Sequence, residues 1–350
     1  MNKYDNYIIS KDAKIIDAVA KINEVSGLQP LVLFVVDKNN CIKGSLTDGD
    51  VRRALLSGMS VNQSVQDAMN KNFHCVKDID NYEEIKKLKE EDLKIVPFVT
   101  PDNKIIELID LTKTKTILPL DAFIMAGGKG IRLKPYTDSI PKPMLQLNDR
   151  PIIAHNIDRL LTFGVKKFYV SVNHLKEQIK NFLEIQYKDS SIEIVFVEED
   201  APLGTIGSLS LVDSFSHKDI LVINADILTN IDFEDFYLSY KKANAQMSVA
   251  TYNIKINIPY AVMETEGDCV KSFVEKPVYT YYSNAGIYLL NKNIITHIPQ
   301  NIHYDTIDLI EKLVKEGEKV SHFLIRGYWL DIGNQENYKK AQDDINFVKF

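Results

Sequence analysis

The segment at residues 123–147 concentrates residue types that bind phosphate. Its sequence is FIMAGGKGIRLKPYTDSIPKPMLQL, in which an apolar stretch runs directly into GGKG at 127–130. Because glycine has no Cβ, several backbone N–H groups can point at an anion that lies close to the chain. Arg132 and Lys142 add positive charge, the first as a planar fork and the second as a point charge. The pattern predicts a loop that binds a polyphosphate.

Two familiar phosphate loops do not fit this segment. A Walker A loop requires a GK[ST] step, which does not follow at the right spacing, and the dinucleotide pattern GxGxxG is missing as well. The competing interpretation is a plain glycine turn. That interpretation does not account for Arg132 or for the PKP step around Lys142.

Two aspartates end apolar stretches later in the chain. Asp226 closes LVINAD, which places its carboxylate at the carboxyl edge of the expected sheet, and Asp331 closes the short run YWLD. Two carboxylates together with phosphate oxygens form a typical Mg²⁺ site, because the ion prefers hard oxygen ligands. For a lone aspartate at a strand end, a helix cap or a solvated turn is the more common explanation.

The sequence resembles the sugar nucleotidyltransferases, which join a nucleoside triphosphate to a sugar 1-phosphate and release pyrophosphate. The family pattern GGxGTRLxPxT…PKPM stands here as GGKGIRLKPYT and PKPM. The resemblance covers roughly residues 121–346 and recurs in order at PLGTIGSL (202–209), NADIL (224–228), VEKP…NAGIY (274–288) and WLDIGNQENYKKA (329–341). One glycine loop would be weak support, whereas five ordered matches indicate the family.

The resemblance implies roles for individual residues. Nucleotide-binding positions are Ala126, Gly127, Gly128, Lys129, Gly130, Glu199, Gly204 and Thr205. Sugar-phosphate-binding positions are Ala261, Glu275, Lys276, Asn284 and Gly286. Asp226 and Asp331 are implied Mg²⁺ ligands, while Glu275 accepts hydrogen bonds from sugar hydroxyls and Lys276 holds the sugar phosphate. A plain surface pair is the alternative for Glu275 and Lys276.

The implied reaction needs no protein nucleophile. A sugar-phosphate oxygen attacks the α-phosphorus in line, and catalysis comes from positioning and charge neutralisation. Arg132 stabilises the departing pyrophosphate, while Lys142 and Lys276 hold the attacking groups.

Glu199 bears on which base is bound. Related thymidylyl and uridylyl enzymes carry glutamine in the stretch before LGT, which can both donate and accept. An ionised glutamate only accepts. Guanine offers a neighbouring pair of N–H donors that a carboxylate can accept together, so GTP is the predicted substrate. The alternative is that Glu198 and Glu199 are solvated loop charges.

The sugar is predicted from the domain order. Enzymes with this order resemble guanylyltransferases of bacterial surface-sugar pathways, and those that supply glucosamine for legionaminic acid look most similar. Glucosamine 1-phosphate is therefore the predicted acceptor, with mannose or heptose 1-phosphate, or a thymidylyl or uridylyl enzyme, as alternatives. Ile131 replaces a common threonine, and Ala261 replaces a common glycine and could alter which sugar fits. A catalytically silent regulator that binds sugar nucleotides is an alternative of another class.

The elements that must position these residues alternate between strand and helix over 119–350, which predicts a doubly wound, mostly parallel, Rossmann-like α/β sheet. Residues 205–215 are expected to form a helix. Short strands are expected at 247–254, 269–275 and 284–290.

The chain changes character near residue 120. Before it, an amphipathic helix followed by two apolar strands occurs twice, an internal repeat of about 50–60 residues. The connector TKTKTILPL (112–120) is the expected boundary between an N-terminal α+β region at 1–118 (two copies, about 1–62 and 63–118) and a catalytic domain at 119–350.

The stretch LFVVDKNNCIKGSLTDGDVRRAL (33–55) resembles a CBS motif, and the front region resembles a CBS pair. In that family a T-x-x-D step contacts the ribose of an adenine nucleotide, which implies Thr47 and Asp50 here. The second copy lacks the step, so at most one nucleotide site is expected. Asp48 or Asp50 is expected to cap a helix that stops at Gly58. A structural or dimer-forming module is the alternative, and a homo-oligomer is expected because CBS pairs commonly stack.

Composition excludes several classes of protein. The 350 residues include 42 basic and 48 acidic side chains, a net charge of −6, which argues against a dedicated nucleic-acid binder. The three cysteines lie far apart, so neither a disulfide framework nor structural zinc is expected and a reducing cytosol fits best. The first residues contain no apolar core of a signal peptide, and no window approaches 18 apolar residues, so secretion and membrane association are not expected.

Overall fold

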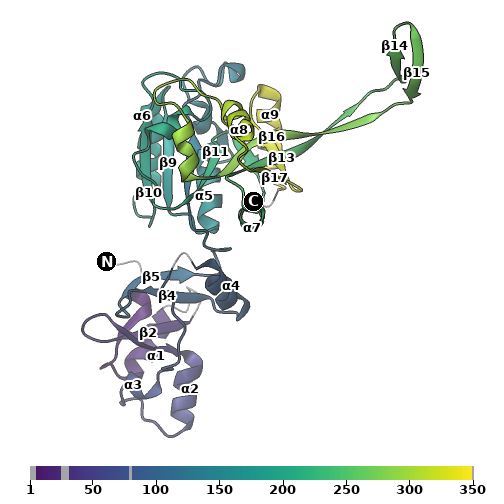
Figure 1. Cartoon of the computed structure of the whole chain (residues 1–350). Coiled ribbons are helices and arrows are strands. Elements are labelled where there is room, and N and C mark those ends of the chain that lie inside the picture. Colours follow the sequence, from purple (N-terminus) through teal and green to yellow (C-terminus); the bar gives the residue numbers. More distant parts are fainter. Residues whose placement is uncertain (1–4, 25–30, 79–80, 349–350) are drawn as a thin grey trace. The chain divides into compact units, whose positions relative to one another are not determined.

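The computed structural model describes residues 5–24, 31–78 and 81–348. The chain divides into two compact units, Met1–Ile117 and Leu118–Phe350, whose helices and strands are labelled in Figure 1. The outermost residues of the expected domains, 1–4 and 349–350, lie outside the described residues. Within the described part of the chain, no helix is both long and apolar enough to cross a membrane.

The N-terminal unit contains a three-stranded sheet, a separate two-stranded sheet and four helices within its described residues. The sheets are β1 (Ile8–Ser10), β2 (Val32–Val36) and β3 (Ile42–Thr47), and β4 (Ile95–Val99) with β5 (Ile105–Asp110). The helices are α1 (Ile15–Glu24), α2 (Asp48–Leu56), α3 (Val65–Ala68) and α4 (Tyr82–Glu90).

The same layout of a helix and a hairpin is seen twice in this unit. The two hairpins, β2–β3 and β4–β5, are antiparallel and both carry an irregularity near the turn. Their turns include Asn40 and Asn103, each with φ 62°. Asparagine tolerates this left-handed conformation better than most residues because its short side chain can hydrogen-bond locally. The internal repeat is therefore seen in the backbone conformation of the turns as well as in the pattern of apolar residues.

The cap of α2 differs from the sequence expectation. Thr47, in an extended conformation, is the N-cap residue, and its Oγ1 accepts from the backbone N–H of Asp50. Asp50 in turn accepts from the backbone N–H of Thr47, which completes a capping box. The prediction of Asp48 or Asp50 as the cap was wrong, because a hydroxyl one residue earlier reaches the same free N–H groups. The helix ends at Leu56, and Gly58 follows with φ 94°.

The second unit is built on a seven-stranded sheet in the order β10-β9-β6-β11-β16-β13-β17. Its strands are β6 (Leu120–Met125), β9 (Lys167–Val172), β10 (Glu193–Glu198), β11 (Asp219–Asn224), β13 (Met247–Asn257), β16 (Val278–Asn291) and β17 (Val320–Leu324). Four neighbouring pairs are parallel, and only β16 runs against its two neighbours. The predicted mostly parallel α/β sheet is confirmed.

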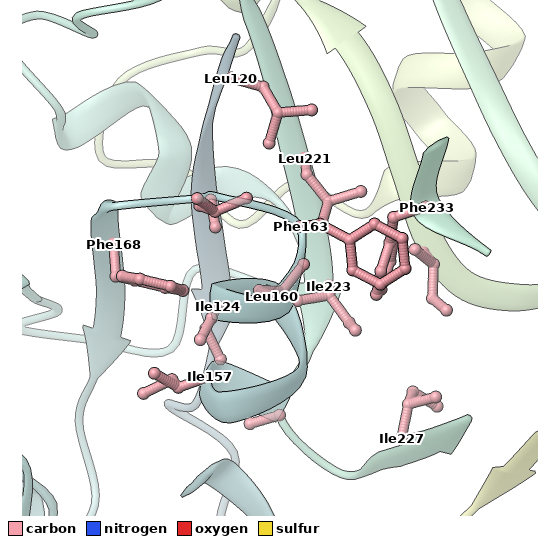
Figure 2. Packing of buried hydrophobic residues seen from close by; sticks show 14 of the residues in the cluster. Leu120, Ile124, Ile157, Leu160, Phe163, Phe168, Leu221, Ile223, Ile227 and Phe233 are labelled. Carbon is pink, nitrogen blue, oxygen red and sulfur yellow. The ribbon is translucent and has the colours of Figure 1, made fainter. Parts of the chain in front are cut away.

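Helices cover both faces of this sheet. They are α5 (Ile152–Thr162), α6 (Lys176–Gln186), α7 (Phe233–Ala243) and α8 (Thr306–Lys315), while α9 (Gln335–Asp344) packs through Tyr338 and Ala341 in a separate apolar cluster with Leu330. Residues of α5 pack with alternate residues of β6 and β11 in one apolar cluster, part of which Figure 2 shows around Phe163 and Phe233. Phe123, between those alternate positions of β6, packs instead with Leu309 of α8. The sheet is therefore doubly wound, because successive side chains of a strand point to opposite faces.

The segment expected to be a helix at 205–215 contains only a 3₁₀ turn, η4 (Gly207–Leu211). The backbone N–H groups of Ile206 and Gly207 both donate to the carbonyl of Tyr304, at 3.2 Å each. Gly204 has φ 81°, and a Cβ there would lie 2.6 Å from the same carbonyl oxygen. The helix prediction was wrong because these N–H groups bind a distant segment of the chain.

Two of the strands expected after residue 246, β13 and β16, are longer than expected, whereas the strand expected at 269–275 ends one residue earlier. β13 and β16 extend well beyond the sheet as a pair and end in a second hairpin, β14 (Val262–Glu266) and β15 (Cys269–Val274). Figure 1 shows this pair projecting away from the sheet. Besides β14 and β15, the described residues of this unit form two further short strand pairs. These are β7 (Gln146–Leu147) with β8 (Arg150–Pro151), and β12 (Ile227–Thr229) with β18 (Trp329–Asp331).

Candidate active site

The glycine loop follows β6 at the carboxyl edge of the sheet. Gly130 has φ 63°, and a Cβ there would lie 3.0 Å from Cβ of Lys142 and 3.1 Å from Cγ2 of Thr137. Thr137 donates through Oγ1 to the carbonyl of Gly130 at 2.8 Å. At Gly128 an added Cβ would meet nothing within 4 Å. The loop is thus held at Gly130 and open at Gly128, where a ligand can approach the backbone.

The two aspartates come together through a short strand pairing. β12 and β18 are antiparallel, with Ile227 opposite Asp331. The backbone N–H of Ile332 donates to the carbonyl of Asp226 at 3.0 Å. The ammonium group of Lys142 is bonded to Oδ2 of Asp226. Three residues far apart in sequence, Lys142, Asp226 and Asp331, are therefore neighbours.

The carboxylates of Asp226 and Asp331 use only part of their capacity to accept hydrogen bonds. Oδ1 of Asp226 and Oδ1 of Asp331 are buried, and neither has a hydrogen-bond partner among the described residues. Burial raises the pKa of Asp331, and the negative charge of Asp226 raises it further, against the opposing effect of Lys142 and Arg132. Buried polar atoms are nearly always paired in folded proteins, so these two oxygens point to a bound group that supplies a positive charge.

Arg132 lies beside Asp331 at Gly333. A Cβ on Gly333 would be 3.3 Å from Nη2 of Arg132 and 3.3 Å from Oδ1 of Asp331. Gly333 was not among the residues singled out from the sequence. The available signal was its place in WLDIG, two residues after Asp331.

Arg132, Lys142, Asp226 and Gly333 line a cavity of about 380 Å³. Its lining residues are Met125, Ala126, Gly128, Lys129, Gly130, Ile131, Arg132, Lys142, Pro143, Ala225, Asp226 and Gly333. Three of them are cations and one is a carboxylate. Such a cavity, at the carboxyl edge of a doubly wound sheet, suits a ligand rich in phosphate.

The two neighbouring glutamates at the end of β10 have different surroundings. Glu198 bonds to Lys176 and Lys180, and these two lysines lower its pKa to about 2. Glu199 turns toward the glycine loop, where a Cβ on Gly127 would lie 2.8 Å from its Oε1. The other oxygen, Oε2, accepts from the backbone N–H of Leu203 at 3.2 Å. Glu199 therefore keeps one carboxylate oxygen beside the loop, and Glu198 is an exposed ion-pair partner.

Three other expected nucleotide-binding positions are engaged within the protein. The backbone N–H of Ala126 donates to the carbonyl of Ser171 at 3.1 Å. Thr205 donates through its backbone N–H to Oδ1 of Asp305 at 2.9 Å, and its hydroxyl accepts from the N–H of Thr306 at 2.9 Å. Gly204 packs on Tyr304, as described above. The segment containing Gly204 and Thr205 is thereby tied to the start of α8.

The expected sugar residues fall into two groups. Gly286, with φ 72°, lies so close to Asn224 that a Cβ would be 2.7 Å from Nδ2, and its N–H donates to Oδ1 of Asn284 at 2.9 Å. Asn224, two residues before Asp226, was missed by the sequence analysis. Ala261, Glu275 and Lys276 are exposed on the projecting part of the β13–β16 pair. The structure does not bring these three to the cavity.

The N-terminal unit contains a second cavity of about 380 Å³, lined by residues of both of its hairpins. Thr47, Asp50, Arg53, His74 and Lys94 contribute its polar side chains along with Ser45, Asn70 and Asp92. Oγ1 of Thr47 donates to Oδ2 of Asp50 at 2.6 Å, and Nη2 of Arg53 bonds to Oδ1 of Asp50 at 2.5 Å. The expected ribose-binding pair is therefore in one cavity, and its two members are bonded to each other.

A doubly wound sheet with a glycine loop, basic side chains and paired carboxylates at its carboxyl edge defines a nucleotide-binding α/β domain. Residues 121–346 match the family model described as Nucleotidyl transferase, and the chain belongs to this family. Residues 1–57 match the CBS domain model.

Similar proteins match the second unit. Proteins named mannose-1-phosphate guanyltransferase from Pichia angusta and Candida albicans are both 30% identical over 230 residues, 63% of this chain and 62% of theirs. The chain thus spans less than two thirds of the length of these relatives. A crystal structure of HddC from Yersinia pseudotuberculosis is 28% identical, with a TM-score of 0.51, and covers 65% of this chain and 99% of its own. A second structure of HddC, complexed with GMP-PN, is 26% identical with a TM-score of 0.50 over 65% and 99% of the two chains.

Proposed function

We propose that the protein is a sugar-1-phosphate guanylyltransferase, which converts GTP and a hexose 1-phosphate into a GDP-sugar and pyrophosphate. The observation that carries the proposal is the cavity in which Arg132, Lys142 and Asp226 meet the glycine loop, with the partly unpaired carboxylate of Asp331 beside Asp226. The names of the mannose-1-phosphate guanyltransferases and the GMP-PN complex of HddC support guanine as the base. The oxygen of Glu199 beside Gly127 supports it from this chain's own geometry.

Asp226 and Asp331 fit a magnesium ion. Each presents one buried oxygen that has no partner among the described residues, and carboxylate oxygens are the ligands the ion prefers. Among those residues no group of three or more His, Cys, Asp or Glu side chains could hold a metal ion, so phosphate oxygens and water complete the proposed set. When bound, the ion neutralises charge on the phosphates and helps to align them.

The remaining chemistry requires positioning by the protein. An oxygen of the sugar phosphate attacks the α-phosphorus of GTP, the bond from that phosphorus to the β-phosphate bridging oxygen breaks, and pyrophosphate leaves. The attacking oxygen is already anionic, so no general base is needed. Arg132 neutralises charge on the departing pyrophosphate, and Lys142 holds the attacking group beside the α-phosphate.

The identity of the sugar is the finer part of the proposal. Glucosamine 1-phosphate is the acceptor we propose from the domain order, and mannose 1-phosphate is the acceptor named in the fungal relatives. Glu275 accepts hydrogen bonds from the sugar hydroxyls and Lys276 binds its phosphate. Ala261, where a glycine is common, narrows the choice of sugar.

A substrate panel tests the function. The protein is incubated with Mg²⁺, each of the common nucleoside triphosphates and a set of sugar 1-phosphates (glucosamine, mannose, heptose and glucose) while pyrophosphate is measured. We expect release with GTP and one hexose 1-phosphate, and its loss in Asp226→Ala. Release with UTP or dTTP at rates above that with GTP would contradict the role of Glu199, and full turnover in Asp226→Ala would contradict the metal site. Absence of release in every combination, with sugar nucleotides still bound, would establish the silent regulator.

We also propose that the cavity of the N-terminal unit binds an adenine nucleotide. Thr47 and Asp50 supply ribose contacts there, while Arg53, His74 and Lys94 supply cations for phosphate. Calorimetry with AMP, ATP and GTP tests this proposal. Binding of an adenine nucleotide that is lost in Asp50→Ala supports it, and the absence of heat with all three supports a structural role for the unit.

A further inference from the structure

The β13–β16 pair carries an arm, which we define as residues 252–284. β17 pairs with β13 from Met247 to Thr251, and β11 pairs with β16 from Ile287 to Asn291. Beyond those residues the two strands pair with each other, to Asn257 opposite Val278, and continue into the β14–β15 hairpin. The outer edges of the arm therefore have no strand beside them among the described residues, and Figure 1 shows the arm extending away from the sheet.

One face of the arm is apolar and exposed. Ile254 lies opposite Tyr281, and Ile256 lies opposite Tyr279, so these four side chains share a face. All four are more than a third exposed. At the tip, Met263 lies opposite Phe273, and these are 61% and 68% exposed. Two strands alone are marginally stable in water, and apolar patches with free edges are typical of surfaces that another chain covers.

The arm also carries residues of the proposed sugar site. Glu275 and Lys276 are exposed near its far end, and Lys276 has φ 44° immediately before Pro277. A left-handed conformation is costly for a lysine, and more so before a proline, and such strain is concentrated at functional sites. Lys276 has this conformation at the point where the chain passes from β15 to β16.

The rest of the proposed sugar site lies at the base of the arm. Asn284 and Gly286 are beside Asn224, next to the cavity. Asn284 follows Val278 by six positions along the extended strand β16, which corresponds to roughly 20 Å at about 3.3 Å per residue. Lys276 lies beyond Val278, so it cannot reach the cavity of its own chain while the arm is extended.

The cavity needs groups that can recognise a sugar. Among the described residues that line it, the polar side chains are Lys129, Arg132, Lys142 and Asp226, which suit phosphates and a metal ion. The end of the arm at 258–277 has the opposite balance of charge, with four carboxylates and two lysines. A segment with this charge can dock at the mouth of a cationic cavity.

We propose that the arm of one chain docks on the catalytic unit of a second copy and completes its sugar site with Glu275 and Lys276. This inference rests on the proposed function, because it assigns the source of the sugar-binding residues. In a two-fold dimer the exchange is mutual, so each copy both supplies and receives an arm. The apolar face of Ile254, Ile256, Tyr279 and Tyr281 is covered in the process.

Complementation between two inactive chains tests the arrangement. One chain carries Lys276→Ala, with an intact cavity and a defective arm, and the other carries Asp226→Asn, with a defective cavity and an intact arm. The chains are co-expressed with different tags, and complexes that contain both are isolated by two affinity steps. We expect each variant alone to be nearly inactive and the mixed dimer to have about half of the wild-type rate, because one of its two sites combines intact parts.

Several outcomes overturn the proposal. If the mixed complex is no more active than either variant alone, the arm does not complete the site of a second chain. A wild-type protein that is monomeric while active, or a Lys276→Ala chain that is fully active alone, removes the need for a partner's arm. Lys315→Ala is the control, because Lys315 is an exposed lysine of α8, outside the arm, that pairs with Glu311, and it should leave the rate unchanged. Wild-type activity measured in parallel separates these outcomes from failure of the proposed function, which would leave the wild-type chain inactive as well.

Discussion

The cavity at the glycine loop and the cavity of the N-terminal unit both have a volume of about 380 Å³, but their acidic side chains have different surroundings. In the catalytic unit, Asp226 and Asp331 each leave a buried oxygen without a partner among the described residues. In the N-terminal unit, Asp50 bonds to Thr47 and to Arg53. The catalytic cavity therefore has a strong requirement for a bound cation, whereas a ligand of the N-terminal cavity competes with bonds that already exist.

Replacing the arginine of the catalytic cavity should have the largest effect. We expect Arg132→Ala to lower kcat by about 10²–10³-fold, because it removes a fixed charge aimed at the departing group. Arg132→Lys keeps the charge but loses the planar fork, so its loss should be smaller. Steady-state rates of pyrophosphate release measure both variants. A kcat of Arg132→Ala close to that of the wild type would show that this cavity is not the site of chemistry.

Changing the base-binding residue should have a more moderate effect. We expect Glu199→Gln to lower the preference for GTP over UTP by about tenfold, because an amide carries no negative charge and adds a donor where guanine also presents donors. The measurement is the ratio of kcat/KM for the two nucleotides. Glu198→Gln is the control, since Glu198 is bonded to Lys176 and Lys180, and it should leave the ratio unchanged. An unchanged ratio in Glu199→Gln as well would place base recognition elsewhere.

Thr47 allows the two roles of the N-terminal cavity to be separated. Thr47→Ala removes the N-cap of α2 and should lower the free energy of unfolding of this unit by about 1 kcal/mol. Thr47→Ser retains a hydroxyl and should retain most of that stability. Thermal unfolding measures how much the cap contributes to stability, and calorimetry measures the binding of adenine nucleotides. If Thr47→Ala leaves stability unchanged, the capping box contributes nothing and the contrast between the cavities is weaker.

The smallest expected effect is on stability, and it comes from the buried carboxylate of Asp331. The pKa of Asp331 is raised in the folded protein, so its contribution to stability is greatest at acid pH and is lost as pH rises through that raised pKa. At pH 7 without divalent cations, Asp331→Asn should therefore raise the unfolding temperature of the catalytic unit by about 2 °C.

The gain in Asp331→Asn should shrink as pH falls through the raised pKa of Asp331 toward the ordinary carboxyl value of about 4, because the folded wild-type side chain takes up its proton over this range. Added Mg²⁺ should stabilise the wild type and have less effect on the variant. Calorimetric scans over a pH series, with and without Mg²⁺, measure both effects. A destabilised variant in the absence of metal would show that Asp331 is satisfied within the protein.

Much of the catalytic unit could be predicted from local sequence. The glycine loop, Arg132 and Lys142 lie within twenty residues, and the apolar strand before them determines which edge of the sheet they occupy. The failed predictions involve distant partners. Residues 205–215 are not a helix because their N–H groups bind Tyr304, and Thr205 is bonded to Asp305 and Thr306. None of these three partners can be inferred from the segment itself.

The sequence by itself determined the phosphate loop and the order of strands and helices, because both depend on spacing between near neighbours. Only the tertiary structure decided that Asp331 lies beside Asp226, since that contact depends on the register of two short strands about a hundred residues apart. The same holds for Glu275 and Lys276. Their motif is readable, but the distance between them and the cavity follows from how far β13 and β16 continue to pair, which depends on long-range contacts along the whole arm.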